Sequence, residues 1–399
     1  MHNLDLAHTP NVAMGDSTWM DGIHDRMDRW LTHPRLHRWA LSNPLSRWFM
    51  RRRTTQIFDI MSGFVYSQVL LSCVRLNIFT IVRQAPVTLE ELAARTQLST
   101  AALQRLVLSA VSLNLLEPRS RERIGLGPLG APIAAHEGIR AMIEHNSLLY
   151  RDMAEPTEFL RNAWSGRMAD YWPYAHADTQ EQVKSADAGY VDRYSELMAA
   201  SQTFVVEEVL HTVPFGDTTC VLDVGAGKGR FVAELARRHP HLQFKLFDLP
   251  QVLALARSNH AALGLQAPVQ YHAGSFFQDE LPLGADLVTL IRVAHDHPDD
   301  GVRTIFRKIY SALPVGGTLV LAEPMAQESG ADASASGDAY FHFYLLAMGA
   351  GRLRTPAELS RMLRDCGFVH VELLPNAMPI HTRILIARKP GTVSAVSSK

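Results

Sequence analysis

From Thr219 onward the chain alternates short apolar strands with helices. Apolar strands separated by helices are typical of a mostly parallel sheet covered by helices on both faces. The expected strands are 219–225, 243–249, 269–273, 286–292, 317–324, 368–374 and 382–388, and the expected helices are 229–238, 250–263, 299–313, 338–348 and 355–366. The sequence therefore predicts a doubly wound, Rossmann-like, seven-stranded α/β domain.

A glycine-rich turn joins the first of these strands to its helix and reads Asp223-Val-Gly225-Ala-Gly227-Lys-Gly229. Glycines let the backbone turn tightly and come close to a ligand. Arg230 stands where the dinucleotide fingerprint has its third glycine, and the Gly-Lys-Ser/Thr of a P-loop is missing. The second strand ends in Asp248, where a carboxylate can accept hydrogen bonds from both ribose hydroxyls. The pattern predicts a nucleoside-containing ligand at this edge of the sheet.

A second polar group follows the fourth strand and reads Arg292-Val-Ala-His295-Asp296-His297-Pro298-Asp299-Asp300, and Glu323 ends the next strand. Both lie at the carboxyl edge of the sheet, where such folds bind ligands. A histidine oriented by a carboxylate can act as a general base. A zinc site is the rival interpretation, but the final histidine of an HxHxDH pattern is missing, so no metal is expected. His297 is expected to be a surface residue beside a helix start.

The segment 88–126 has a winged-helix pattern. Thr88 and Glu91 form a capping box at one helix, Ser99 and Thr100 open a second, and 115–126 resembles a hairpin with its turn at 118–121. Such a module can bind DNA or dimerise. Lys and Arg number 39 and Asp and Glu 40, a net charge of −1, and this balance argues against nucleic acid as a partner. Upstream, residues 55–80 are almost wholly apolar and predict a buried helix.

The expected domains are an extension over 1–53, a helical region over 54–212, the α/β domain over 213–389 and a solvated tail over 390–399. The extension holds eight arginines and five aspartates, and it has apolar residues at helical spacing in 19–31. It is expected to pack on protein, with a membrane-surface helix over 17–53 as the alternative. Residues 140–212 are rich in aromatic residues and predict either plain core or the wall of an apolar pocket.

Three widely spaced cysteines and no apolar leader predict a cytoplasmic protein without disulfides. No continuous run of 18 apolar residues occurs, so no membrane-spanning helix is expected.

The glycine motif followed by Asp248 resembles that of class I S-adenosylmethionine-dependent methyltransferases. Over about residues 55–388 the chain is similar to the plant-type small-molecule O-methyltransferase family, which has a His-Asp-Trp and a downstream Glu where this chain has His295 and Glu323. The resemblance implies that these two residues are catalytic, that S-adenosylmethionine is the cofactor, and that the winged-helix domain forms a homodimer. It implies cofactor contacts from Asp223, Gly225, Gly227, Asp248, Leu249, Ser275, Phe276 and Arg292.

The chain departs from the family in its extension before residue 50, which is not general to the family, and at three single positions. Ser275 replaces an aspartate that reads the adenine amine, and Leu353 replaces a second catalytic glutamate. His297 replaces the tryptophan. The resemblance therefore implies that catalysis depends on His295 and Glu323 alone.

Three longer stretches, at 58–79, 198–210 and 338–352, resemble the bacterial hydroxyneurosporene (demethylspheroidene) O-methyltransferases of carotenoid synthesis. The resemblance implies an apolar acceptor with a tertiary hydroxyl, a pocket formed by Met198, Phe341, Tyr344 and Met348, and a place beside the inner or photosynthetic membrane. The alternatives are a methyltransferase of the same fold that acts on a phenol, a polyketide or a pigment ring carbon, and a ligand-responsive DNA-binding regulator.

Overall fold

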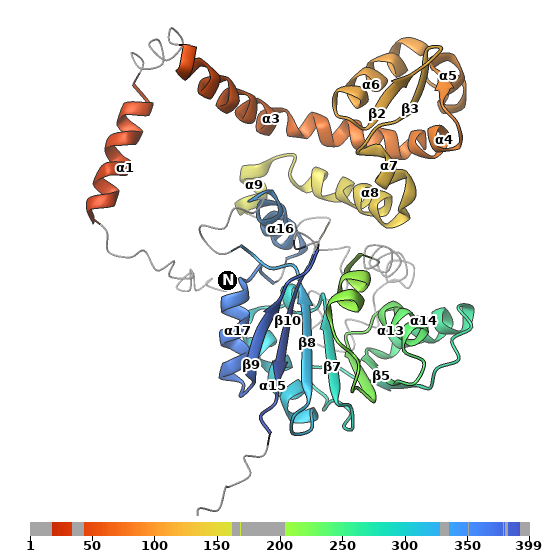
Figure 1. Cartoon of the computed structure of the whole chain (residues 1–399), viewed down its shortest axis with the longest axis vertical. Coiled ribbons are helices and arrows are strands. Elements are labelled where there is room, and N and C mark those ends of the chain that lie inside the picture. The colour runs from red at the N-terminus through yellow and green to blue at the C-terminus, as the bar shows by residue number, and fades with distance from the viewer. Residues whose placement is uncertain are drawn as a thin grey trace, which may run out of the picture. The chain divides into compact units, whose positions relative to one another are not determined.

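The computed structural model describes residues 18–33, 44–161, 168, 204–327, 335–349, 351–377, 379 and 382–391. The chain divides into two compact units, Met1–Leu70 and Leu71–Lys399. The first unit contains α1 (Thr18–Leu31) and most of α3 (Pro44–Arg75), coloured red to orange in Figure 1. The expected boundary at residue 53 falls inside α3, which runs through it without a break.

Helix α3 differs from the buried helix expected over 55–80. It ends at Arg75, since Asn77 takes a left-handed φ of 54° before α4 (Ile78–Gln84) begins. Ile60 is 83% and Phe64 71% exposed in the single chain. The prediction of burial is therefore wrong for most of this helix, because its apolar side chains find neighbours in the single chain only near its end.

One stretch of α3 bears on the expectation that no segment spans a membrane. Met50–Arg75 contains an 18-residue window with a mean hydropathy of 1.6, of which 17% is buried, so it has the length and composition of a membrane span. The core helices of soluble proteins pass the same test, so it does not by itself identify what covers this helix.

The winged-helix pattern is present in the second unit. It comprises β1 (Val87–Thr88), α5 (Leu89–Thr96), α6 (Thr100–Ser112), β2 (Leu116–Arg119) and β3 (Arg123–Leu126), with antiparallel strand order β1-β3-β2. The predicted capping box is confirmed, because the Thr88 side chain accepts from the Glu91 backbone N–H and the Glu91 side chain accepts from that of Thr88. The hairpin turn is later than expected: Arg121 and Glu122 take φ of 59° and 54°, the left-handed pair that suits a tight hairpin.

Three helices follow the wing, α7 (Gly130–Ala135), α8 (Glu137–Asp152) and α9 (Pro156–Arg161). Residues 204–212 are also helical and precede the α/β domain. The expected aromatic wall over 140–212 falls largely outside the described residues.

The α/β domain is a seven-stranded sheet with the order β6-β5-β4-β7-β8-β10-β9. Its strands are β4 (Cys220–Val224), β5 (Gln243–Asp248), β6 (Val269–Ala273), β7 (Leu287–Ile291), β8 (Thr318–Glu323), β9 (Val369–Leu374) and β10 (Arg383–Arg388). The first five are parallel, and β10 pairs antiparallel with both β8 and β9. The predicted seven-stranded doubly wound sheet is confirmed. The strand order reverses beside β4, so the ends of β4 and β7 form the crevice where ligands bind in such sheets.

Helices flank this sheet (Figure 1). They are α13 (Arg230–Arg238), α14 (Pro250–Ala262), α15 (Asp299–Ala312) and α17 (Pro356–Asp365), whereas α16 (Ala335–Met348) packs with α8 and α9. Successive residues of each strand point to opposite faces. Leu222, Val288 and Leu321 join one buried cluster with residues of α15 and α17, whereas Val221, Leu287 and Val320 join another with residues of α13 and α14. Burial on both faces explains why the strands are continuously apolar.

Candidate active site

A buried histidine–glutamate pair lies at the carboxyl ends of β7 and β8. The His295 ring is 4% exposed and Glu323 is 1% exposed. His295 Nδ1 lies 2.5 Å from Glu323 Oε2, while Oε1 accepts from the backbone N–H groups of Val293 (2.9 Å) and Ala294 (2.7 Å). Because the Glu323 carboxylate already accepts two backbone N–H bonds, we assign Nδ1 of His295 as the donor to it, and in the neutral ring the lone pair is then on Nε2. The structure thus brings together the two residues expected to be catalytic.

Asp296 is a third member of this group. Its Oδ1 lies 3.2 Å from His295 Nε2. Burial raises the pKa of Asp296, as does the charge of Glu323, whereas the charges of His295 and Arg292 lower it, and the net shift is upward. Sequence analysis did not select Asp296, although it adjoins His295, because adjacency in sequence does not reveal which ring nitrogen a side chain faces.

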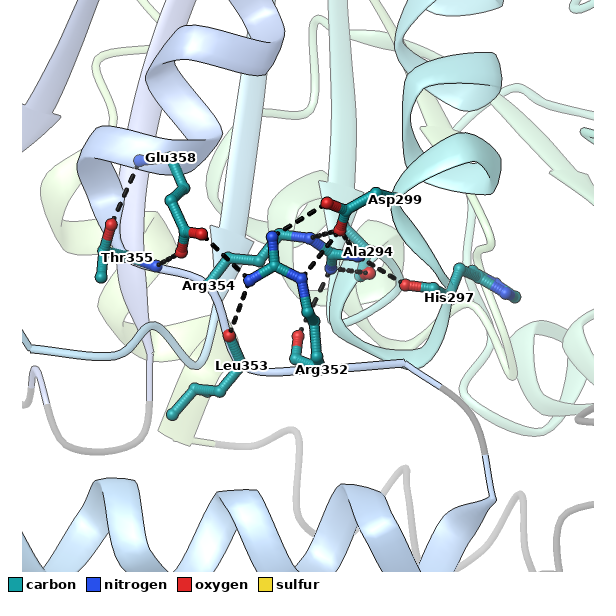
Figure 2. A network of polar contacts seen from close by, with 8 residues as sticks. All are labelled: Ala294, His297, Asp299, Arg352, Leu353, Arg354, Thr355 and Glu358. Atoms are coloured by element: carbon teal, nitrogen blue, oxygen red, sulfur yellow. Dashed lines mark hydrogen bonds and ion pairs between the residues drawn. The ribbon is translucent and has the colours of Figure 1, made fainter. Parts of the chain in front are cut away.

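The short 3₁₀ helix η3 (Ala294–Asp296) that carries His295 is braced by the segment 351–354. Arg354 is fully buried, and its guanidinium donates to the backbone carbonyls of Ala294 (2.9 Å) and His297 (2.7 Å), as Figure 2 shows. The backbone N–H of Arg352 donates to the backbone carbonyl of His295 at 3.0 Å. Gly351 adopts φ of +78°, and a Cβ there would lie 2.0 Å from that carbonyl, so only glycine fits. The backbone around His295 is therefore fixed by a segment more than fifty residues away.

Asp299, the first residue of α15, pairs with both arginines of this brace, and Glu358 also pairs with Arg352 (Figure 2). Its carboxylate accepts from Arg352 Nε and Nη2 and from Arg354 Nε, all at 2.9 Å. Burial would raise the pKa of Asp299, but the hydrogen bonds and charges of Arg352 and Arg354 outweigh burial and lower it to about 2. The sequence placed Asp299 in the polar group after the fourth strand but singled out neither arginine, since a buried arginine produces no periodic signal.

We expect Arg354→Met to lower the free energy of unfolding by about 2–4 kcal/mol, because it strips partners from two buried carbonyls and from Asp299. Arg352→Met is the matched control. The Arg352 side chain is 36% exposed and its ion pairs face solvent, so its loss is expected to cost at most about 1 kcal/mol. Urea denaturation followed by circular dichroism measures both, and equal costs would contradict the bracing role of Arg354.

The glycine-rich turn lies at the adjoining end of β4. Gly225, Gly227 and Gly229 all take positive φ, at 72°, 56° and 68°. A Cβ on Gly225 would lie 2.6 Å from a methyl of Val293, so the turn packs directly against the loop that leads to His295, whereas a Cβ on Gly227 would meet open space. The predicted turn therefore presents bare backbone at the carboxyl edge of the sheet.

Two carboxylates border this turn. Asp248 is half-buried, and it accepts from the backbone N–H groups of Gly227 (2.8 Å) and Leu249 (2.7 Å). Burial raises its pKa to about 6, although both of these hydrogen bonds lower it. Asp223 is buried and accepts from the Thr289 hydroxyl at 2.7 Å, and burial raises its pKa to about 7. Each Asp248 oxygen has a further lone pair with which to accept a ligand hydroxyl.

The other expected cofactor residues follow the carboxyl ends of neighbouring strands, Ser275 and Phe276 after β6 and Arg292 after β7. Arg292 directly follows β7 and takes a φ of 55°, which is a strained conformation for a residue with a side chain. The Ser275 backbone N–H donates to Asp279 at 2.8 Å, and the Ser275 hydroxyl accepts from the Phe277 N–H at 3.3 Å, so this serine organises its own loop. Phe276 packs against the sheet core.

His297 corrects one expectation. Its ring lies edge-on to Phe276 (5.4 Å between centroids) and Phe277 (5.1 Å), so it is not a simple surface residue. Burial, with smaller contributions from His295 and Arg354, lowers its pKa to about 4. Among the residues that the structure describes, no group of three or more His, Cys, Asp and Glu could hold a metal.

The expected pocket residues on α16 form a packed cluster with α8 and α9. Tyr344 is 3% and Met348 1% exposed, and Phe341 packs against the same cluster. The Tyr344 hydroxyl lies 3.2 Å from His145 Nε2 on α8. Helix α16 also contacts η3, so the cluster adjoins His295. Met198 lies outside the described residues.

Comparison with known protein families agrees with this geometry. The model of the O-methyltransferase domain matches residues 150–369, and the model of the O-methyltransferase dimerisation domain matches residues 58–129. The dimerisation match includes the winged-helix pattern and supports a homodimer.

Two curated relatives cover most of the chain. Demethylspheroidene O-methyltransferase of Rhodobacter capsulatus is 39% identical over 85% of this chain and 83% of its own length. The enzyme of the same name from Cereibacter sphaeroides is 36% identical over 86% of this chain and 88% of its own.

Solved structures share the fold. Human N-acetylserotonin methyltransferase in complex with S-adenosylmethionine matches with a TM-score of 0.70 and 22% identity, over 85% of this chain and 98% of that one. The pyocyanin biosynthetic protein PhzM matches with a TM-score of 0.71 and 20% identity, over 85% of this chain and 99% of that one.

The described residues fit a nucleoside-containing cofactor, because a bare glycine backbone and a carboxylate with free lone pairs meet beside a buried histidine. The matched domain models and the identity to curated relatives over most of the chain lead to one conclusion. This chain belongs to the S-adenosylmethionine-dependent O-methyltransferase family.

Proposed function

We propose that the enzyme methylates the tertiary 1-hydroxyl of an acyclic carotenoid of the hydroxyneurosporene or demethylspheroidene type. The observation that carries this proposal is the 36–39% identity to two demethylspheroidene O-methyltransferases over about 85% of the chain. The apolar and aromatic residues of α16 beside η3 suit an apolar acceptor.

In the proposed reaction His295 is the general base and Glu323 orients it. S-adenosylmethionine supplies a methyl group that is already activated for transfer to oxygen. The chain must hold the acceptor hydroxyl in line with it and accept the hydroxyl proton. Because a tertiary alcohol is a weak acid, the proton leaves with or after attack of the oxygen, and Nε2 receives it.

The carboxylates on either side of the ring support this role. When Nε2 takes up a proton, the imidazolium lies between Glu323 at Nδ1 and Asp296 at Nε2. Two flanking carboxylates stabilise this cation in a buried site, where electrostatic interactions are stronger than in water. We propose that Asp296 helps to hold the proton until it leaves the site.

We propose that the cofactor lies over the glycine turn. The backbone of Gly225 and Gly227 would approach it, and Asp248 would accept from the ribose hydroxyls. The remaining contacts are assigned to Asp223, Leu249, Ser275, Phe276 and Arg292. Because Ser275 already binds within its own loop, we assign it a smaller part in adenine recognition than the aspartate that the family has there.

The acceptor pocket is proposed to include Met198, Phe341, Tyr344 and Met348. We propose that residues 213–389 form the catalytic domain and that 54–212 form the dimerisation and substrate-wall region. The exposed apolar face of α3 would be covered in the homodimer from about residue 58, where the dimerisation match begins. Since the acceptor dissolves in lipid, the enzyme is proposed to work in the cytoplasm, beside the inner or photosynthetic membrane.

The decisive experiment is a methyl-transfer assay read by mass spectrometry. Purified protein is mixed with S-adenosylmethionine and detergent-dispersed 1-hydroxy acyclic carotenoids, and a product heavier by one methylene group is expected. No carotenoid product, with tight binding of S-adenosylhomocysteine, would overturn the proposed acceptor and direct the assay to phenols, polyketides and pigment ring carbons.

A further inference from the structure

The segment that precedes the dimerisation match carries a continuous apolar stripe. On α1, Trp19, Ile23, Met27 and Trp30 are between 47% and 68% exposed. Their spacing of four, four and three residues places them on one face of the helix. The match to the dimerisation domain begins only at residue 58, so this stripe lies outside the part of the chain that is assigned to dimer formation.

The same segment is strongly basic. From Arg29 to Phe58 there are seven arginines and no lysine, aspartate or glutamate. With Arg26 and the three aspartates of α1 (Asp21, Asp25 and Asp28) included, residues 18–58 carry +5, and since the whole chain carries −1 the other residues together carry −6. The three arginines at 51–53 are exposed on α3. A surface of this charge attracts an anionic partner. The same anionic partner repels the rest of the protein, whose net charge is negative.

Tryptophan is concentrated in the same place. Four of the six tryptophans, Trp19, Trp30, Trp39 and Trp48, fall within thirty residues, and Trp48 is 66% exposed. Tryptophan prefers the headgroup level of a bilayer, where its ring meets both lipid chains and water. Arginine pairs with lipid phosphates in fixed geometry. Nucleic acid would satisfy the arginines but not an exposed stripe of aliphatic side chains.

We infer that α1 and the exposed start of α3, residues 18–33 and 44–58, bind the face of an anionic lipid bilayer. Helix α1 has 14 residues, about 21 Å in length, which is too short to cross a hydrocarbon core of about 30 Å. It lies in the interface instead, with Trp19, Ile23, Met27 and Trp30 among the lipid chains and its aspartates toward water. The inference rests on the proposed function in one respect only. Binding to the bilayer would bring the enzyme to an acceptor that is dissolved in lipid.

The test is cosedimentation of the full-length protein with vesicles. One set contains phosphatidylcholine alone and the other contains phosphatidylcholine with one part in three of phosphatidylglycerol. The protein is expected to bind the anionic vesicles at least about tenfold more tightly, with binding lost at high salt. Equal binding to both vesicles, or binding to neither, would overturn the inference.

Two sets of variants test whether the arginines of α3 and the tryptophans of α1 contribute to vesicle binding. The triple variant Arg51→Gln, Arg52→Gln, Arg53→Gln is expected to weaken binding to anionic vesicles at least about tenfold, as is Trp19→Ser with Trp30→Ser. The matched control is Arg361→Gln, Arg364→Gln, Arg388→Gln, which removes three exposed arginines from the α/β domain and should leave binding unchanged. If the control weakens binding as much as the test variant, general charge and not this surface is responsible.

Light scattering and the detergent assay separate the other outcomes. Variants that become monomers while still binding vesicles would identify the surface as an interface between two copies, and the inference would be wrong. Loss of vesicle binding with full methylation in detergent supports the membrane surface. A wild-type protein that binds anionic vesicles yet methylates no carotenoid leaves this inference standing and overturns only the proposed acceptor.

Discussion

His295→Gln is expected to lower kcat by about 10²–10⁴-fold, the usual contribution of a positioned general base. Glutamine has no nitrogen that can take up the hydroxyl proton, whereas Nε2 of His295 has a free lone pair when Nδ1 donates to Glu323. Single-turnover measurements of methyl transfer report the chemical step, and calorimetric titration with S-adenosylhomocysteine should give an unchanged Kd.

His297→Gln is the control for this prediction. Its ring packs edge-on against Phe276 and Phe277, so its replacement is expected to change kcat by less than about tenfold, through packing alone. Full activity in a folded His295→Gln protein would show that another group accepts the proton. A loss in His297→Gln equal to that in His295→Gln would also contradict the assignment of a single base.

Glu323→Gln is expected to lower kcat by a similar 10²–10⁴-fold while the protein stays folded. The amide oxygen can still accept from the N–H groups of Val293 and Ala294, but the amide nitrogen then faces Nδ1 of His295. An N–H donor at Nδ1 moves the ring proton to Nε2, and a protonated Nε2 cannot act as base. Nitrogen-15 NMR of the histidine ring measures the tautomer directly, and a ring that keeps its proton on Nδ1 would contradict this explanation.

Glu323→Ala separates the chemical role from the structural one. This change leaves two buried N–H groups without their acceptor, so we expect it to lower the free energy of unfolding by about 1–3 kcal/mol for each group. Glu323→Gln should cost much less. Because His295 and Glu323 act as one unit, the double variant with His295→Gln should be scarcely slower than either single variant.

The sheet and its helices could be predicted closely because both of their periodicities are local. Strands such as 269–273 and helices such as 250–263 agree with the structure to within a residue. The pairing of His295 with Glu323 followed from the same pattern, since the ends of neighbouring parallel strands meet at one edge. The exposure of α3 could not be predicted in this way, because an apolar pattern does not show that most of these side chains lack neighbours in the single chain.

The sequence by itself determined the doubly wound sheet, the glycine turn and the histidine–glutamate pair, since each depends on residue types at short spacing. Only the tertiary structure showed that Asp296 faces Nε2 and that Arg354 holds the carbonyls of Ala294 and His297. Arg354 lies sixty residues from Ala294 in the chain, and loop closure over that distance leaves no periodic trace in the sequence. Such contacts arise when the chain just after β8 pairs with the segment after α16, at Met325 and Arg354, so they belong to the packed fold and to no single stretch of the chain.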